Sequence, residues 1–104
     1  CSSDLAIVEK KSNKLIGIFL ITPISSSDCR IGCSIGKNYW RMGYGIEVMT
    51  LMTEYLKNLN YKKLIGLIKK ENLPSIKLVE KLKYTLIEQT EYPEFFKYEK
   101  MINV

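Results

Sequence analysis

The feature that most constrains this chain is a change of hydrophobic period along residues 29–69. Cys29–Gly36 is typical of a strand, and Lys63–Lys69 holds an apolar run that predicts a buried central strand. Between them, Gly43–Asn58 has the period of an amphipathic helix. The predicted apolar face of this helix consists of Val48, Met52, Tyr55, Leu56 and Leu59. A strand, a helix and a strand in this order predict two parallel strands joined by a right-handed crossover.

The segments on either side of this unit predict further strands and a second helix. Asp4–Lys10 and Leu15–Thr22 are joined by a short polar link, which favours an antiparallel hairpin. Leu15–Thr22 is a continuous run of β-branched and aliphatic residues, typical of a strand buried on both faces. Asn72 is a candidate N-cap for a second helix, whose apolar face holds Ile76, Val79 and Leu82. The remaining strands are predicted at Leu86–Thr90 and Phe95–Ile102.

The elements follow the order β-β-β-α-β-α-β-β. This order predicts an α/β domain with a mixed sheet, antiparallel at its ends and parallel in the middle. The chain has 104 residues, a usual size for one domain, so residues 1–104 are expected to form a single unit.

Composition excludes several classes of function. There is no histidine, which removes the Ser-His-Asp and Cys-His catalytic arrangements and most zinc sites, so no metal is expected. Lysine and arginine exceed carboxylates by 16 to 11, which favours an anionic partner. The longest apolar run, Leu15–Ile21, is too short to span a membrane. Three cysteines without a C-x-x-C pair indicate free thiols in a reducing cytoplasm, and they are Cys1, Cys29 and Cys33.

Two glycines stand between a predicted strand and the strongest helix. Gly43 and Gly45 do not complete a dinucleotide fingerprint, because Val48 occupies the third glycine position. They still leave the first amides of the helix bare, and Arg41 adds a cation beside them. Anion binding and an ordinary strand-to-helix turn are both open readings of this segment. Asn72 and Ser75 are likewise explained either by helix capping or by a site.

Trp40–Glu47 resembles the acetyl-CoA-binding motif of the GNAT acyltransferase superfamily, in the form seen in ribosomal-protein (Rim-type) N-acetyltransferases. Asn72-x-x-Ser75 followed by Glu80–Tyr84 resembles that family's second motif, Asn-x-x-Ser and Glu-Lys-x-Gly-Phe. The two motifs are 29 positions apart, counted from Gly43 to Asn72. The resemblance covers Asp4–Met101.

The resemblance implies an N-acetyltransferase that moves an acetyl group from acetyl-CoA to a primary amine on a protein N-terminus, a peptide or a small molecule. The amine would attack the thioester directly in a ternary complex. Asn72 would hold the cofactor arm or a water, and Ser75 is the candidate donor to the leaving thiolate. The residues implied in coenzyme A binding are Trp40, Arg41, Met42, Gly43, Tyr44, Gly45, Ile46, Asn72 and Ser75.

The chain departs from the family pattern in ways that leave alternatives open. No strand and helices precede the hairpin, so the domain is expected to be truncated relative to the family. Arg30 stands where relatives often carry a glutamate, Lys83 where they carry glycine, and Val79 where many carry a tyrosine. A non-catalytic acyl-CoA-binding remnant is therefore the alternative, and a small basic nucleic-acid-binding protein ranks last. An exposed edge strand and uncovered apolar surface predict a homodimer.

Overall fold

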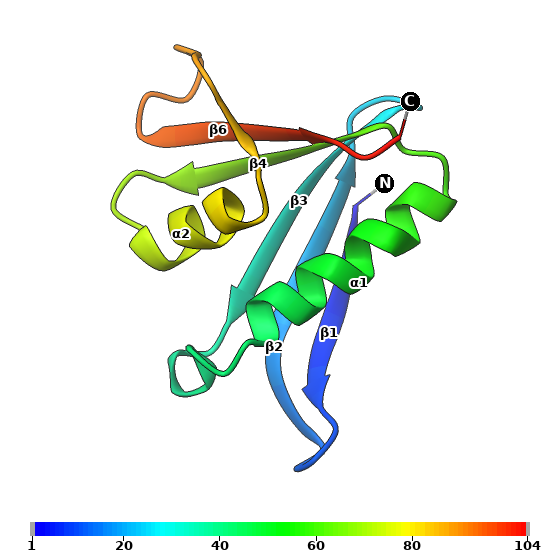
Figure 1. Cartoon of the computed structure of the whole chain (residues 1–104), viewed down its shortest axis with the longest axis vertical. Coiled ribbons are helices and arrows are strands. Elements are labelled where there is room, and N and C mark those ends of the chain that lie inside the picture. The colour runs from blue at the N-terminus through cyan, green and yellow to red at the C-terminus, as the bar shows by residue number, and fades with distance from the viewer. Residues whose placement is uncertain (1, 104) are drawn as a thin grey trace.

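The computed structural model describes residues 2–103, which form one six-stranded mixed sheet and two helices (Figure 1). The strand order is β1-β2-β3-β4-β6-β5, and β3 with β4 is the parallel pair. The predicted α/β class and mixed sheet are confirmed. The strands are β1 Ser3–Glu9, β2 Lys14–Pro23, β3 Asp28–Ile35, β4 Lys63–Lys69, β5 Thr85–Ile87 and β6 Phe95–Met101. The helices are α1 Tyr44–Asn58 and α2 Leu73–Lys81, and a 3₁₀ turn, η1, spans Lys37–Tyr39.

The parallel pair separates after three residues. Asp28–Arg30 of β3 pairs with Lys63–Ile65 of β4, and no pairing between the two strands continues beyond that point. Beyond it, β3 remains paired with β2 as far as Ile35, and β4 remains paired with β6 as far as Lys69. Each strand therefore follows its outer neighbour, and a split opens between them (Figure 1). We call this opening the β3–β4 split.

Both helices cover the same face of the sheet. A single cluster of buried residues joins α1 and α2 to β2, β3, β4 and β6. Met49 and Leu56 anchor α1 in this cluster, and Val79 anchors α2. The sheet supplies Phe19, Ile21, Cys29, Ile31, Leu64 and Tyr98. One core between one sheet face and two helices is what a right-handed crossover from β3 to β4 requires.

The opposite face of the sheet carries exposed apolar side chains, which corrects one prediction. Leu15–Thr22 was expected to be buried on both faces, yet Leu15 is 64% exposed, and Ile18 and Leu20 are each 44% exposed. Successive side chains of a strand point to opposite faces, so Phe19 enters the core while Ile18 and Leu20 face away from the helices. We call this side the open face. No helix of residues 2–103 covers it.

Two local predictions also require correction. On α1, Leu56 is buried, and Val48 and Met52 pack against the core as predicted. Tyr55 and Leu59 are instead about half exposed, and the buried Met49 was missed. The strand predicted at Leu86–Thr90 is the three-residue β5. It ends early because the Gln89 side chain organises the following loop, donating to the carbonyls of Tyr92 and Phe95 and accepting from the Tyr92 amide.

Both helices end in the same type of left-handed turn. Asn60 after α1 and Lys83 after α2 have positive φ angles of 71° and 67°. After α2, the Lys83 amide donates to the Glu80 carbonyl, and the Tyr84 amide donates to the Val79 carbonyl at 2.9 Å. These two bonds define a Schellman turn, whose left-handed position, taken here by Lys83, favours glycine. No helix in the described residues is long and apolar enough to cross a bilayer.

Candidate functional site

The site begins at the first turn of α1. Gly43 is the N-cap in a left-handed conformation, with φ of 83°, and it makes no side-chain capping bond. The first bond of the helical ladder runs from the Glu47 amide to the Gly43 carbonyl at 3.1 Å. The amides of residues 44–46 precede that bond and have no partner within the helix. They lie at the positive end of the helix dipole, where an anion is stabilised.

Gly45 allows α2 to approach this turn. A Cβ atom at Gly45 would lie 3.3 Å from Cδ2 of Leu78, which is closer than ordinary contact. The absence of a side chain at Gly45 therefore lets α1 pack closely against α2, and it also leaves the bare amides accessible to a ligand. On the other side, Trp40 is held by a hydrogen bond from its indole Nε1 to the Ile35 carbonyl at 2.7 Å.

The start of α2 supplies the second wall. The Asn72 side chain accepts a hydrogen bond from the Ser75 amide at 3.4 Å, so the predicted N-cap is confirmed. Pro74 lies in the first turn, where its missing N–H is not needed. Asn72 and Ser75 both face the space between α2 and β3.

A cleft of about 650 Å³ lies between the starts of α1 and α2. The charged residues that line it are all cations: Arg41, Lys77 and Lys81. Sequence reasoning missed the two lysines, although their spacing of four on α2 places them on one helix face. Three cations and the bare amides of α1 together make this cleft suited to an anion of several charges.

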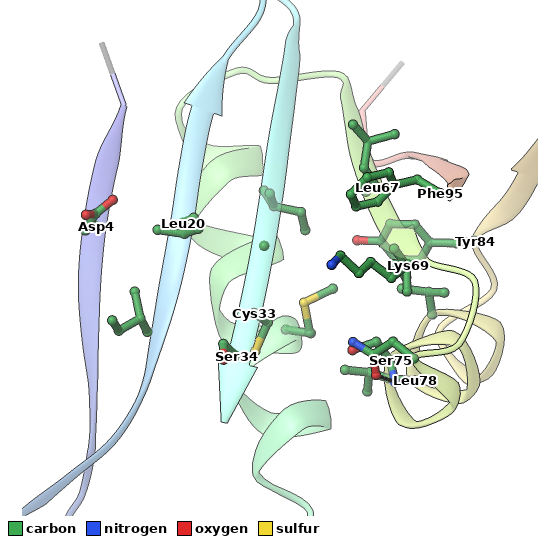
Figure 2. Close-up of a pocket in the computed structure, with 18 residues that line it drawn as sticks. Asp4, Leu20, Cys33, Ser34, Leu67, Lys69, Ser75, Leu78, Tyr84 and Phe95 are labelled. Carbon is green, nitrogen blue, oxygen red and sulfur yellow. Dashed lines mark hydrogen bonds between the residues drawn. The ribbon is translucent and has the colours of Figure 1, made fainter. Parts of the chain in front are cut away.

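The cleft continues into the β3–β4 split. A second cavity of about 390 Å³ fills the split (Figure 2). Five residues line both cavities and mark the passage, which is the place where the cavities meet: Cys33, Ser34, Asn72, Ser75 and Leu78. In Figure 2, Cys33 and Ser34 lie on β3 and face Ser75 and Leu78 across this passage. Because they share these residues, the two cavities adjoin, and together they extend from the start of α1 into the centre of the sheet. We call the two together the channel.

The split is largely apolar, with few titratable groups. Asp4 and Lys69 are the charged residues that line it, and Asp4 is its one carboxylate among the described residues. Burial raises the pKa of the Cys33 thiol to about 11. Since the thiolate is the nucleophilic form, Cys33 is a poor candidate for an acyl-cysteine intermediate at neutral pH.

The structure brings most of the sequence-predicted site residues together. Around the cleft lie the side chains or backbone of Trp40, Arg41, Gly43, Gly45, Ile46, Asn72 and Ser75. Met42 does not line the cleft and is 57% exposed. Tyr44 turns away from it and donates from its hydroxyl to the Glu9 carboxylate on β1. These two residues can offer only their backbone to a ligand in the cleft.

The Glu9–Tyr44 pair has shifted ionisation. Hydrogen bonds from Ser12 and then Tyr44 lower the pKa of the Glu9 carboxyl. The same bond to Glu9 is the main cause that raises the pKa of the Tyr44 hydroxyl. Within residues 2–103, no group of three or more His, Cys, Asp or Glu side chains is arranged to hold a metal ion.

The channel therefore fits an elongated molecule with an anionic head and a narrow arm. Its bare amides and cations are at one end, and its apolar split is at the other. Acyl-coenzyme A has this form, with phosphates at one end and a thioester at the end of a thin arm.

Comparisons with known proteins agree with this geometry. A family model for the acetyltransferase (GNAT) domain matches residues 2–85. The chain is 29% identical over 82 residues to an uncharacterized N-acetyltransferase p20 of Bacillus licheniformis. That alignment covers 76% of this chain and 46% of the relative, so the chain spans just under half the length of that curated protein.

Solved structures share the fold. A domain from Methanocaldococcus jannaschii superposes with a TM-score of 0.86 at 26% identity, over 96% of this chain and 66% of that one. The Campylobacter jejuni N-acetyltransferase PseH, solved in complex with acetyl coenzyme A, gives a TM-score of 0.77 at 16% identity, over 96% and 67% of the two chains. The finer resemblance, to the ribosomal-protein (Rim-type) N-acetyltransferases within the GNAT family, stays a prediction. The family model matches most of the sequence, and the chain belongs to the GNAT acetyltransferase family.

Proposed function

We propose that this chain binds acetyl-CoA and transfers the acetyl group to a primary amine on a protein N-terminus, a peptide or a small molecule. The observation that carries the proposal is the pair of adjoining cavities that extend from the bare amides of α1 into the β3–β4 split. PseH, which shares this fold, is described in complex with acetyl coenzyme A.

The chain's own residues divide the task of holding this substrate. The backbone of residues 42–46 would bind the diphosphate, with Arg41, Lys77 and Lys81 around it. Asn72 and Ser75 line the passage and would contact the arm. The apolar lining of the split would exclude water from the thioester end, which strengthens every polar interaction there.

The proposed reaction is direct transfer. A carbon–nitrogen bond forms as the carbon–sulfur bond breaks, the electron pair of the broken bond stays on sulfur, and the proton lost by the amine passes to water. The Ser75 hydroxyl is the proposed proton donor to the leaving thiolate, and it regains a proton from water, so that the products are the acetylated amine and coenzyme A. Asp4 lies on the open face beside Leu20, with which it is paired in the sheet, and it would attract a cationic amine to the split.

Binding of coenzyme A measured by titration calorimetry tests this proposal. Lys77→Gln combined with Lys81→Gln should weaken binding about 3- to 10-fold at low salt, as loss of two exposed ion pairs implies. The matched control is Lys10→Gln with Lys11→Gln, the same change of charge at the β1–β2 turn. Equal affinity in both double variants, or no binding by the wild type, would contradict the proposal. Release of thiol from acetyl-CoA across a panel of amines then tests transfer.

Binding of acyl-CoA without turnover is the second candidate. It is favoured by the scarcity of carboxylates in the split, where Asp4 stands alone among the described residues. Tight binding of coenzyme A with no thiol release for any amine would support it over transfer.

We also propose a homodimer in the cytoplasm. β1 is an edge strand of the sheet, and the nearby open face exposes Ile18 and Leu20. Free edges and apolar patches favour pairing. The free thiols of Cys29 and Cys33 are compatible with a reducing compartment. Light scattering at micromolar concentration should give about twice the 12.1 kDa chain mass, whereas a stable monomer would refute the dimer.

A further inference from the structure

Tyr84 carries a buried polar atom with no hydrogen-bond partner among residues 2–103. Its side chain is only 8% exposed, and its hydroxyl makes no hydrogen bond to any described residue. Buried hydroxyl groups are almost always hydrogen-bonded, because burial without a partner is costly. An unpaired hydroxyl in a cavity therefore calls for a ligand that supplies the acceptor.

The neighbours of Tyr84 are already engaged elsewhere. The Lys100 ammonium lies 5.7 Å from the centre of the Tyr84 ring and donates to the Leu82 carbonyl at 2.8 Å. The Tyr84 amide is fixed by its bond to the Val79 carbonyl in the turn after α2. These contacts hold the ring in place and leave its hydroxyl free.

The hydroxyl faces the inner part of the channel. Tyr84 lines the β3–β4 split but not the cleft at the start of α1. In Figure 2 its oxygen is directed into the space between β4 and β3. The buried residues that share this region are apolar: Ile31, Met49 and Val79. A molecule whose anionic head lies at α1 would bring the far end of its arm to this hydroxyl.

We propose that the Tyr84 hydroxyl donates a hydrogen bond to the carbonyl oxygen of the acyl thioester. The inference rests on the proposed function, because it requires the acyl end of the substrate to enter the split. Of the two polar atoms of a thioester, the carbonyl oxygen is the stronger acceptor and sulfur a weak one. Attack by the amine places negative charge on that oxygen, so a donor fixed there stabilises the transition state.

The ionisation of Tyr84 agrees with a donor role. Burial raises the pKa of its hydroxyl to about 12, so it keeps its proton throughout the neutral range. It acts by donating a hydrogen bond only, and no bond to its oxygen forms or breaks.

Tyr84→Phe tests the proposal by comparing two ligands. We expect affinity for acetyl-CoA to fall about 3- to 10-fold, the value of one neutral hydrogen bond, while affinity for coenzyme A without an acyl group is unchanged. The matched control is Tyr98→Phe, because Tyr98 is also buried but does not line the channel. The melting temperature of Tyr84→Phe should equal or exceed that of the wild type, since the lost hydroxyl had no partner.

Infrared spectroscopy of acetyl-CoA labelled with ¹³C at the thioester carbonyl gives an independent readout. The carbonyl stretch should shift to lower frequency on binding to the wild type and return toward the free value in Tyr84→Phe. An unshifted band in the wild type, or equal changes in affinity for both ligands, would overturn the proposal and leave Tyr84 bonded to water only. Failure of the wild type to bind coenzyme A at all would instead refute the proposed function.

Discussion

Gly45→Val is expected to remove most of the affinity for coenzyme A by obstructing the bare amides at the start of α1. The Cβ of any residue at position 45 would lie 3.3 Å and 3.5 Å from the two Cδ atoms of Leu78. Valine adds two further methyl groups in this space, so Leu78 must move or the added methyls must turn toward the cleft. Either arrangement places a side chain where an anion would approach the backbone.

The expected loss of affinity follows from the hydrogen bonds between the backbone amides and the phosphate that the valine would prevent. A hydrogen bond between a backbone amide and a charged phosphate oxygen contributes about 1.5–3 kcal/mol. At about 1.4 kcal/mol for each factor of ten, the loss of one such bond raises Kd about 10- to 150-fold. Crowding against Leu78 costs about 1–3 kcal/mol in folding. Replacing a helical glycine with valine returns only roughly a few tenths of a kcal/mol of this. The remaining cost is small beside a typical stability of about 5–15 kcal/mol, so the variant should remain folded.

Titration calorimetry with coenzyme A should compare Gly45→Val, Leu78→Ala and the double variant. The matched control is Gly36→Ala, because Gly36 precedes the same loop and a Cβ there meets only ordinary contacts at 3.5 Å and 3.7 Å. Wild-type affinity in a folded Gly45→Val protein would refute the site. Full recovery of affinity in the double variant would show that the defect lies in helix packing rather than in access to the amides.

Four other outcomes are expected. Gly17→Ala should lower the free energy of unfolding in urea by about 2 kcal/mol or more, because its Cβ would lie 2.2 Å from the Ser34 carbonyl oxygen; a change below about 0.5 kcal/mol would contradict this packing. Lys83→Gly should raise that free energy by up to about 1 kcal/mol, because φ there is 67°, and leave the Kd of coenzyme A unchanged. Ser75→Ala should lower turnover by ~10²–10⁴ if its hydroxyl is the donor to the thiolate, with a much smaller effect on Kd; equal kinetics would make Ser75 a helix-start residue only. Tyr44→Phe should reduce the free energy of unfolding most at pH values between 4.5 and 10.0, which are the ordinary pKa values of Glu9 and Tyr44. The Glu9 pKa is lowered on folding, so its contribution disappears as pH falls through the folded pKa, and the Tyr44 pKa is raised, so its contribution disappears as pH rises above 10.0. A stability difference that does not change with pH would contradict this pairing.

The elements were predictable where local chemistry fixes them. The period of the 43–58 segment follows from a helix that buries one face, and the Asn72 cap follows from the amides it satisfies. The parallel pair follows from the crossover rule, because a helix between two strands of one sheet returns the chain in the same direction. The two glycines at positions 43 and 45 correctly marked a helix start. That this turn binds an anion stays a prediction.

Features that depend on tertiary packing were not predictable from the sequence. An apolar run such as Leu15–Ile21 looks the same whether one face or both faces are covered, so the exposure of Ile18 and Leu20 was missed. In the sequence, Lys77 and Lys81 are explained by an ordinary solvated helix face. Only the structure shows that α2 places them beside the start of α1. The Tyr84 hydroxyl gives no signal in the sequence, because an aromatic residue at that position is explained by packing alone.

The channel exists because the two central strands keep different partners. β3 stays paired with β2, and β4 stays paired with β6, so their right-handed twists carry them apart after Arg30 and Ile65. Gly66 is the first residue of β4 beyond the last pair, and a Cβ atom there would have no atom within 4 Å other than those of its two chain neighbours. Because Gly66 lines the split, a larger residue there would project into it. The width of the channel is therefore set by strand pairing and by a missing side chain, and the helices then bring the bare amides and cations to its mouth.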